Sequence, residues 1–158
     1  MPGALEGLRV LDLTEREGHL CGRLLADLGA DVIKIEPPEG DPSRRVGPFA
    51  GDGSGIESSL AFINLNTNKK SVTLDLSAED GRQAFQTLVR DADAVVEAFA
   101  PGTLEAWGLD YDTLSKDNPG LVMVSITGFG LSGPYRHFKA PSIVCTAMGG
   151  VMSLCGFP

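Results

Sequence analysis

A run of polar residues, Asn66-Thr67-Asn68-Lys69-Lys70, stands directly before a short apolar segment with the composition of a strand. Its amides can hydrogen-bond the polar edge of an adenine, and its two ammonium groups can bind phosphates. The same residues are also good turn formers. Spacing alone therefore favours a turn with exposed lysines and leaves a nucleotide site as the second interpretation.

A glycine pattern of the form G-x-G-x-x-G runs from Gly128 to Gly133 and follows another predicted strand. In dinucleotide-binding proteins the last glycine of this pattern lies on a helix whose N-terminus faces a pyrophosphate. Here Pro134 follows at once, and a proline disfavours helical angles in the residue before it. We therefore expect a glycine-rich turn, with an NAD-dependent dehydrogenase domain as a minor alternative.

Carboxylates and arginines supply the remaining polar chemistry. Asp12 and Glu36 follow the apolar parts of the first two predicted strands, where parallel sheets bind ligands. Either could instead cap a helix or hold a loop, which is the commoner use. The adjacent arginines Arg44 and Arg45 fit an anion site and a solvated surface equally well.

Catalytic or metal-binding groups of the familiar kinds are not suggested. The cysteines Cys21, Cys145 and Cys155 have apolar neighbours and no Cys-x-x-Cys spacing, which predicts free thiols in a reducing cytoplasm and no metal site. If Cys145 or Cys155 were a nucleophile, only His19 and His137 could act as its base, and neither histidine is near in sequence. No G-x-S-x-G motif is present.

The elements that must position these residues alternate between strand and helix. Residues 8–13 form an apolar strand-like run, and residues 18–29 carry Leu20, Leu24, Leu25 and Leu28 on one helical stripe, which Gly29 is placed to end. Residues 31–36 form the next strand, which completes a βαβ unit with parallel strands. Residues 37–56 are rich in proline and glycine and predict a long irregular loop.

The same alternation continues to the carboxyl end. The pattern predicts further helices and strands over residues 58–63, 71–75, 77–89, 94–99, 104–107, 111–114, 121–126 and 142–152. Ser77 and Asp80 have the spacing of a capping box for the helix that follows. We therefore expect an α/β fold with an open, mostly parallel sheet and helices on both faces.

Length and charge limit the functions that this fold could serve. The chain has 158 residues, which suits one domain over residues 1–158 without a second domain. Its formal charge of −8 argues against a nucleic-acid or anionic-membrane surface but allows a local cation cluster for one phosphorylated ligand. No apolar run is long enough to span a membrane, and the start Met1-Pro2 does not suggest secretion, so we expect a cytoplasmic protein.

Four segments taken together resemble the family III CoA-transferases, also called the CaiB/BaiF family. They are residues 5–14, 25–36, 66–76 and 125–135, in the family's order and spacing. The resemblance implies a Rossmann-like large domain, here an incomplete amino-terminal portion, and two subunits interlocked in a homodimer. It implies substrates rather than bound cofactors: an acyl-CoA and a small carboxylic acid.

The resemblance also implies a mechanism. CoA moves between carboxylates through a covalent intermediate on an aspartate. That aspartate is expected in a Gly-Asp segment beyond Pro158, so the chain as given should contain no catalytic residue and be inactive.

Site residues carry over by position. The resemblance assigns contact with CoA to Asn68, Lys69, Phe99 and Lys139. Other positions depart from the family's pattern, because an amide, two arginines and an acid are replaced by Ala98, Ala100, Ala106 and Ser142. These losses leave open an alternative, in which the chain is a non-catalytic or degenerate CoA-fold module that pairs with an active half.

Overall fold

The computed structural model describes residues 3–52 and 55–155; Met1, Pro2 and the last three residues lie outside the described part. Its centre is a five-stranded parallel sheet with the strand order β3-β2-β1-β4-β5. The strands are β1 Arg9–Leu13, β2 Asp31–Glu36, β3 Lys70–Thr73, β4 Ala94–Glu97 and β5 Val122–Ser125. This order confirms the predicted open, parallel, Rossmann-like α/β fold.

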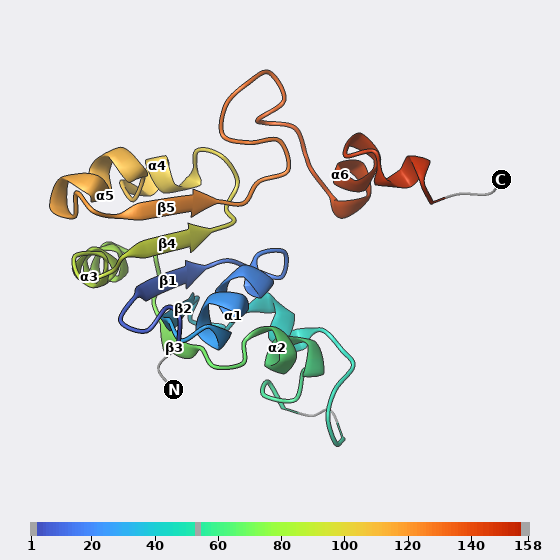
Figure 1. Ribbon diagram of the computed structural model, residues 1–158, viewed down its shortest axis with the longest axis horizontal. Coiled ribbons are helices and arrows are strands. Elements are labelled where there is room, and N and C mark those ends of the chain that lie inside the picture. Colours follow the sequence, from blue (N-terminus) through green and yellow to red (C-terminus); the bar gives the residue numbers. More distant parts are fainter. Residues whose placement is uncertain (1–2, 53–54, 156–158) are drawn as a thin grey trace.

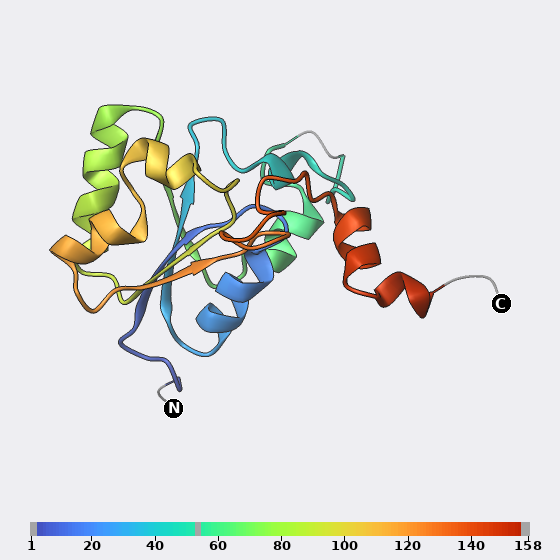
Figure 2. The ribbon, with the colours of Figure 1, turned by 90° about the horizontal axis from the view of Figure 1, so that it is seen from above.

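Helices cover both faces of the sheet, as predicted. They are α1 His19–Asp27, α2 Leu60–Leu65, α3 Glu79–Val89, α4 Thr103–Trp107, α5 Tyr111–Asp117 and α6 Ser142–Met148, with short 3-10 helices η1 Pro42–Arg45 and η2 Val151–Ser153. Figure 2 shows α3, α4 and α5 on one side of the sheet and α1 on the other. No helix within the described residues is long and apolar enough to cross a membrane.

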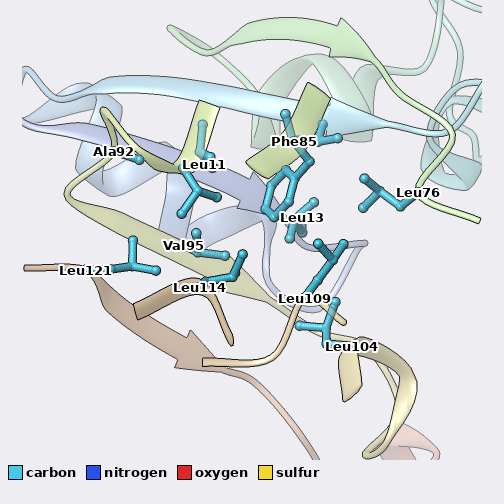
Figure 3. Packing of buried hydrophobic residues seen from close by; sticks show 12 residues of the cluster. Leu11, Leu13, Leu76, Phe85, Ala92, Val95, Leu104, Leu109, Leu114 and Leu121 are labelled. Carbon is cyan, nitrogen blue, oxygen red and sulfur yellow. The ribbon is translucent and has the colours of Figure 1, made fainter. Parts of the chain in front are cut away.

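The larger part of the core lies under α3, α4 and α5. Phe85 of α3 is fully buried and sits among Leu11, Leu13 and Leu76 (Figure 3). A fully buried aromatic side chain contributes roughly 3–5 kcal/mol relative to alanine. The side chains that alternate with these along β1 point to the α1 face, where a smaller apolar cluster includes Val10.

The leucine stripe of the first helix does not face the core. Leu20, Leu24 and Leu28 are 51%, 53% and 51% exposed. The buried residues of α1 are His19, Gly22 and Ala26. Only a glycine fits at position 22, because a Cβ atom there would come within 2.3 Å of Asp12 Oδ2. Of the four leucines on the predicted stripe, only Leu25 packs against the apolar cluster of this face. The helix ends before Gly29, as predicted, and the φ of that glycine is 103°.

Three local predictions also need correction. The helix α3 has Ala78 as its N-cap, and Ser77 instead donates from its backbone N and its Oγ to Asp75, so the capping box does not form. The irregular loop after β2 contains the 3-10 helix η1. The predicted last helix is interrupted by Gly150, whose positive φ of 78° cannot continue a helix.

The segment after β5 leaves the layered body. Figure 1 shows residues 126–141 looping out past the carboxyl end of β5, with α6 standing beyond the sheet. None of the residues in α6 is fully buried. At Gly128 this segment approaches the residues just before α6 so closely that only glycine fits, because a Cβ atom there would lie 2.1 Å from the Cβ atom of Ala140.

Candidate functional site

The sheet reverses its winding between β1 and β4, which are neighbours although they are far apart in sequence. Ligands of doubly wound sheets bind at the carboxyl ends of the strands beside such a reversal. A cleft of about 810 Å³ lies at this edge of the sheet. It is formed by the loop between β1 and α1, the segments after β4 and β5, and the start of α6.

Two residues assigned to CoA contact meet in this cleft, namely Phe99 and Lys139. The Phe99 ring packs edge-on against Trp107 with 5.4 Å between centroids, and its backbone N donates to Glu97 Oε2 at 2.7 Å. Phe99 also lines two smaller hollows of about 260 and 240 Å³. Lys139 forms no hydrogen bond or ion pair with any residue that the structure describes, so its ammonium group is open to a ligand.

The other two assigned residues lie elsewhere, in the turn between α2 and β3. Lys69 Nζ donates to Asp12 Oδ2 at 2.7 Å, to the carbonyl oxygen of His19 at 2.9 Å and to Asn66 Oδ1 at 2.8 Å. An ammonium group has three donors, so none remains for a phosphate in this arrangement. Burial lowers the pKa of Lys69, and the charge of Asp12 opposes that effect.

Asn68 lies at the tip of the same turn, with a φ of 65°. Its side-chain amide donates to Asp27 Oδ1 at 2.8 Å. The turn interpretation of this polar run is therefore confirmed, but Lys69 is buried instead of exposed, with a side chain only 1% accessible. CoA contact through Asn68 and Lys69 stays a prediction from family position.

Buried acids on the α1 side of the sheet hold loops. Glu36 accepts from Arg44 Nε and Nη2 at 2.7 Å each, and from Ser71 Oγ at 2.6 Å. Burial alone would raise the pKa of Glu36, but these bonds, with that from the backbone N of Asp41, lower it to about 2. Asp12 has an equivalent role, since both its oxygens accept hydrogen bonds and its side chain is fully buried.

Asp41 binds the loop after β2 to β2 itself and to the first residue of α1. Its Oδ2 lies 2.7 Å from Lys34 Nζ and 3.0 Å from His19 Nε2, and its Oδ1 accepts from the Ser43 backbone and hydroxyl. Burial opposes ionisation, but bonds from His19 and Lys34 hold the pKa of Asp41 well below its usual value. Within the described residues no buried side-chain polar atom lacks a partner. The loop-holding interpretation of these acids is thus confirmed.

The arginine pair has the same structural use. Arg44 lies over the Phe62 ring with 3.8 Å from its Cζ atom to the ring centroid, while pairing with Glu36 and Glu57. Arg45 donates to the carbonyl oxygen of Glu39 at 2.7 Å. Arg44 is therefore a partly buried side chain held by Glu36 and Glu57, and it is neither fully solvated nor a free anion site.

The glycine pattern has turn geometry. Gly130 and Gly133 have φ angles of 78° and 88°, and in the described chain the next helix begins at Ser142. No helix N-terminus is therefore aimed at a pyrophosphate by this motif. The dinucleotide interpretation has no geometric support here.

Sequence reasoning missed several residues of the cleft, among them Glu17, Phe129 and Arg136. The signal for Glu17 was available, because the loop after the first strand of such a sheet lies at the ligand-binding edge. No periodicity could have placed Phe129 and Arg136, which belong to an irregular segment. Of the positions that depart from the family pattern, the cleft is lined by Ala98, Ala100 and Ser142, and Ala106 lies apart from it.

Known proteins with similar sequences match almost all of the chain. It is 45% identical over 99% of its length to the succinyl-CoA--D-citramalate CoA-transferase of Chloroflexus aurantiacus, covering 39% of that protein. It is 46% identical over 98% of its length to the formyl-CoA:oxalate CoA-transferase of Streptomyces coelicolor, covering 37% of it. The chain thus spans about two fifths of the length of these relatives.

A solved structure agrees with these similarities. The crystal structure of a CaiB/BaiF family protein from Brucella suis superimposes with a TM-score of 0.92 at 43% identity, over 100% of this chain and 42% of that one. The model of CoA-transferase family III matches residues 5–158. The fold, the sequence similarity and this match establish that the chain belongs to CoA-transferase family III.

Proposed function

We propose that the chain is the amino-terminal portion of the large domain of an enzyme that moves CoA between an acyl-CoA and a small carboxylic acid. The observation that carries the proposal is the cleft at the reversal of the sheet, where Phe99 and an unpaired Lys139 lie together. An aromatic ring and a free ammonium group suit the base and the phosphates of a nucleotide. The names of the relatives differ in the acids that they mention, and the transfer of CoA is what these names have in common.

The chemistry follows from exchanging a thioester between two carboxylates. An aspartate beyond Pro158 attacks the acyl-CoA carbonyl, which forms a mixed anhydride and releases the CoA thiolate. The thiolate then attacks the aspartyl carbonyl, so the first acid leaves and an aspartyl-CoA thioester remains. The acceptor acid reverses both steps. In this scheme the present residues hold CoA while the thiolate departs and returns, and no permanently bound cofactor is required.

The proposal extends to the setting of the enzyme. We expect the full-length protein in the cytoplasm, as an interlocked homodimer. The apolar side chains exposed on α6, Ile143 and Met148, are 66% and 65% accessible and suit burial in such an assembly.

The alternative of a degenerate module also has a structural observation behind it. Three of the positions that lost polar groups, Ala98, Ala100 and Ser142, line the same cleft as Phe99 and Lys139. If the CoA site depended on those groups, this half would bind CoA weakly and serve structure or regulation.

Transfer assays on the full-length protein decide between these functions. Succinyl-CoA is incubated with a panel of mono- and dicarboxylic acids, and new thioesters are separated by liquid chromatography. We expect transfer to at least one acid, and its loss when the aspartate of the Gly-Asp segment after Pro158 is changed to alanine. Unchanged transfer in that variant would place catalysis elsewhere and favour the non-catalytic module.

A further inference from the structure

Arg136 differs from most arginines of this chain in having no carboxylate partner. Elsewhere in the described residues, arginines form ion pairs with acids at Arg9, Arg23, Arg44, Arg82 and Arg90. Arg136 lines the cleft and bonds only to its neighbour, with its Nε 2.8 Å from His137 Nε2. Glu17 lines the same cleft but forms no ion pair with it. In a chain of formal charge −8, a cation left unpaired in a cleft needs an explanation.

The bond to His137 orients the guanidinium group. Since the arginine Nε can only donate, His137 Nε2 is the acceptor and carries no proton. The two terminal amino groups of Arg136 make no bond to any described residue. They form a planar fork that matches the spacing of two oxygen atoms of a phosphate or carboxylate.

Aromatic contacts hold this part of the segment in shape. Phe129, Tyr135 and Phe138 pack in a trio with centroid separations of 6.2, 6.3 and 5.1 Å. Phe129 and Phe138 line the cleft together with Phe99. Aromatic faces are platforms for a nucleobase, which favours a nucleotide phosphate over a second carboxylate of a small acid as the anion.

We propose that Arg136, positioned by His137, binds a phosphate group in the nucleotide part of CoA. The inference rests on the proposed CoA-transferase function and adds a residue that selects CoA thioesters over thioesters lacking the nucleotide. A phosphate-binding arginine in this cleft also means that the loss of an arginine at Ala100 does not leave the cleft without a guanidinium group.

Calorimetric titration of the full-length protein with CoA and with pantetheine, which lacks the nucleotide, tests the proposal. In Arg136→Gln we expect CoA to bind about 10- to 100-fold more weakly, because one charge-assisted bidentate contact is lost, with pantetheine unchanged. The matched control is Arg90→Gln, which removes the same charge from an exposed pair with Asp117 and should bind CoA normally. Equal CoA affinity in Arg136→Gln and the wild type would overturn the proposal.

The positioning role of His137 has its own readout. His137→Ala should weaken CoA binding about 3- to 10-fold, and His137→Gln should recover most of it, because the amide oxygen can accept the same bond from Arg136. Failure of glutamine to improve on alanine would contradict the positioning role.

Kinetics separate the two sources of an oxyanion. Arg136→Gln should raise the KM for the acyl-CoA and leave the KM values for acetate and succinate unchanged. A rise in KM for succinate alone would overturn the proposal, because it would mean that the guanidinium group of Arg136 binds the second carboxylate of succinate. If the wild-type protein neither binds CoA nor transfers it, the proposed function fails too; if it does both while Arg136→Gln matches it, only the present inference fails.

Discussion

The two halves of the ligand-binding edge use charge in opposite ways. Beside β1, β2 and β3, the charged groups Asp12, Lys34, Glu36, Asp41 and Lys69 are buried and bound to one another or to nearby loops. Beyond β4 and β5, Arg136 and Lys139 stand in an open cleft without an acid partner. Both halves would look polar and functional in sequence. Among the cations named here, only Arg136 and Lys139 lack an acid partner in the described part of the chain.

This difference shows how burial decides the use of a charge. A buried ion that loses its partner keeps its desolvation cost, so the first half should respond to substitution mainly through stability. An exposed cation costs little to keep or remove, so the second half should respond mainly through ligand binding. The comparison of Lys69 with Lys139 below would fail if the two halves were alike.

Asp41→Ala should have the largest effect. It leaves both Lys34 and His19 without their buried carboxylate, and we expect the free energy of unfolding to fall by about 4–5 kcal/mol. Urea unfolding followed by circular dichroism measures this. Asp112→Ala, at an exposed position in the first turn of α5, is the control and should change stability by less than about 0.5 kcal/mol.

The lysines Lys69 and Lys139 provide the sharpest contrast between the halves. Lys69→Met should reduce the free energy of unfolding by about 3 kcal/mol, because Asp12 keeps only its bonds from Thr14. Lys139→Met should leave unfolding within about 0.5 kcal/mol of the wild type. Its effect should appear in CoA titration instead. The contrast between the two halves would be wrong if the Lys139→Met protein were less stable than the Lys69→Met protein.

Acid should destabilise the fold through the buried carboxylate of Glu36. The pKa of Glu36 lies at about 2 in the folded protein and 4.5 without its partners, so the carboxylate stabilises the fold above the higher value. That stability, roughly 2–3 kcal/mol, is lost as the pH falls from about 5 to about 2. Unfolding measured across this range should show a smaller slope in Glu36→Gln. If the free energy of unfolding fell equally steeply with pH in Glu36→Gln and in the wild type, Glu36 would not be the cause of the acid sensitivity.

The smallest effect should come from the exposed leucines of α1. Leu24→Ser should change the free energy of unfolding by less than about 0.5 kcal/mol in a monomeric sample, since its side chain already meets solvent. Leu25→Ser, one position along, should cost about 1–2 kcal/mol because Leu25 packs against the apolar cluster on this face. Equal losses of stability in the two variants would mean that Leu24 is as buried as Leu25, which would contradict the exposure of the stripe.

The sheet could be predicted from sequence because its signals are local. Short segments rich in apolar and β-branched residues indicated all five strands, and their alternation with helices implied parallel pairing. The inner face of α1 could not be predicted, since Gly22 and His19 face the sheet only because Asp12 and Lys69 occupy the space beneath. Tertiary charge pairing overrode the amphipathic pattern.

The site was predictable only in part. Family position indicated Phe99 and Lys139, and the structure brings both to the cleft. Composition could not show that the ammonium group of Lys69 forms all its hydrogen bonds within the protein, including one to Asp12, which is far away in sequence. Arg136 carried no signal at all, because its segment has neither strand nor helix periodicity.

The strand order has a consequence for how the chain folds. β1 is the central strand, yet its partner β4 is far along the chain, with Val10 paired to Ala94 and the backbone N of Arg9 bonded to Asp93 at a separation of 84 residues. Closing so long a loop costs entropy before any contact repays it, and non-local pairing of this kind slows folding. During synthesis, β1, β2 and β3 can associate first, and one side of β1 stays open until β4 emerges. An unpaired edge of β1 can pair with another chain during that interval, so early release of the first three strands would favour aggregation.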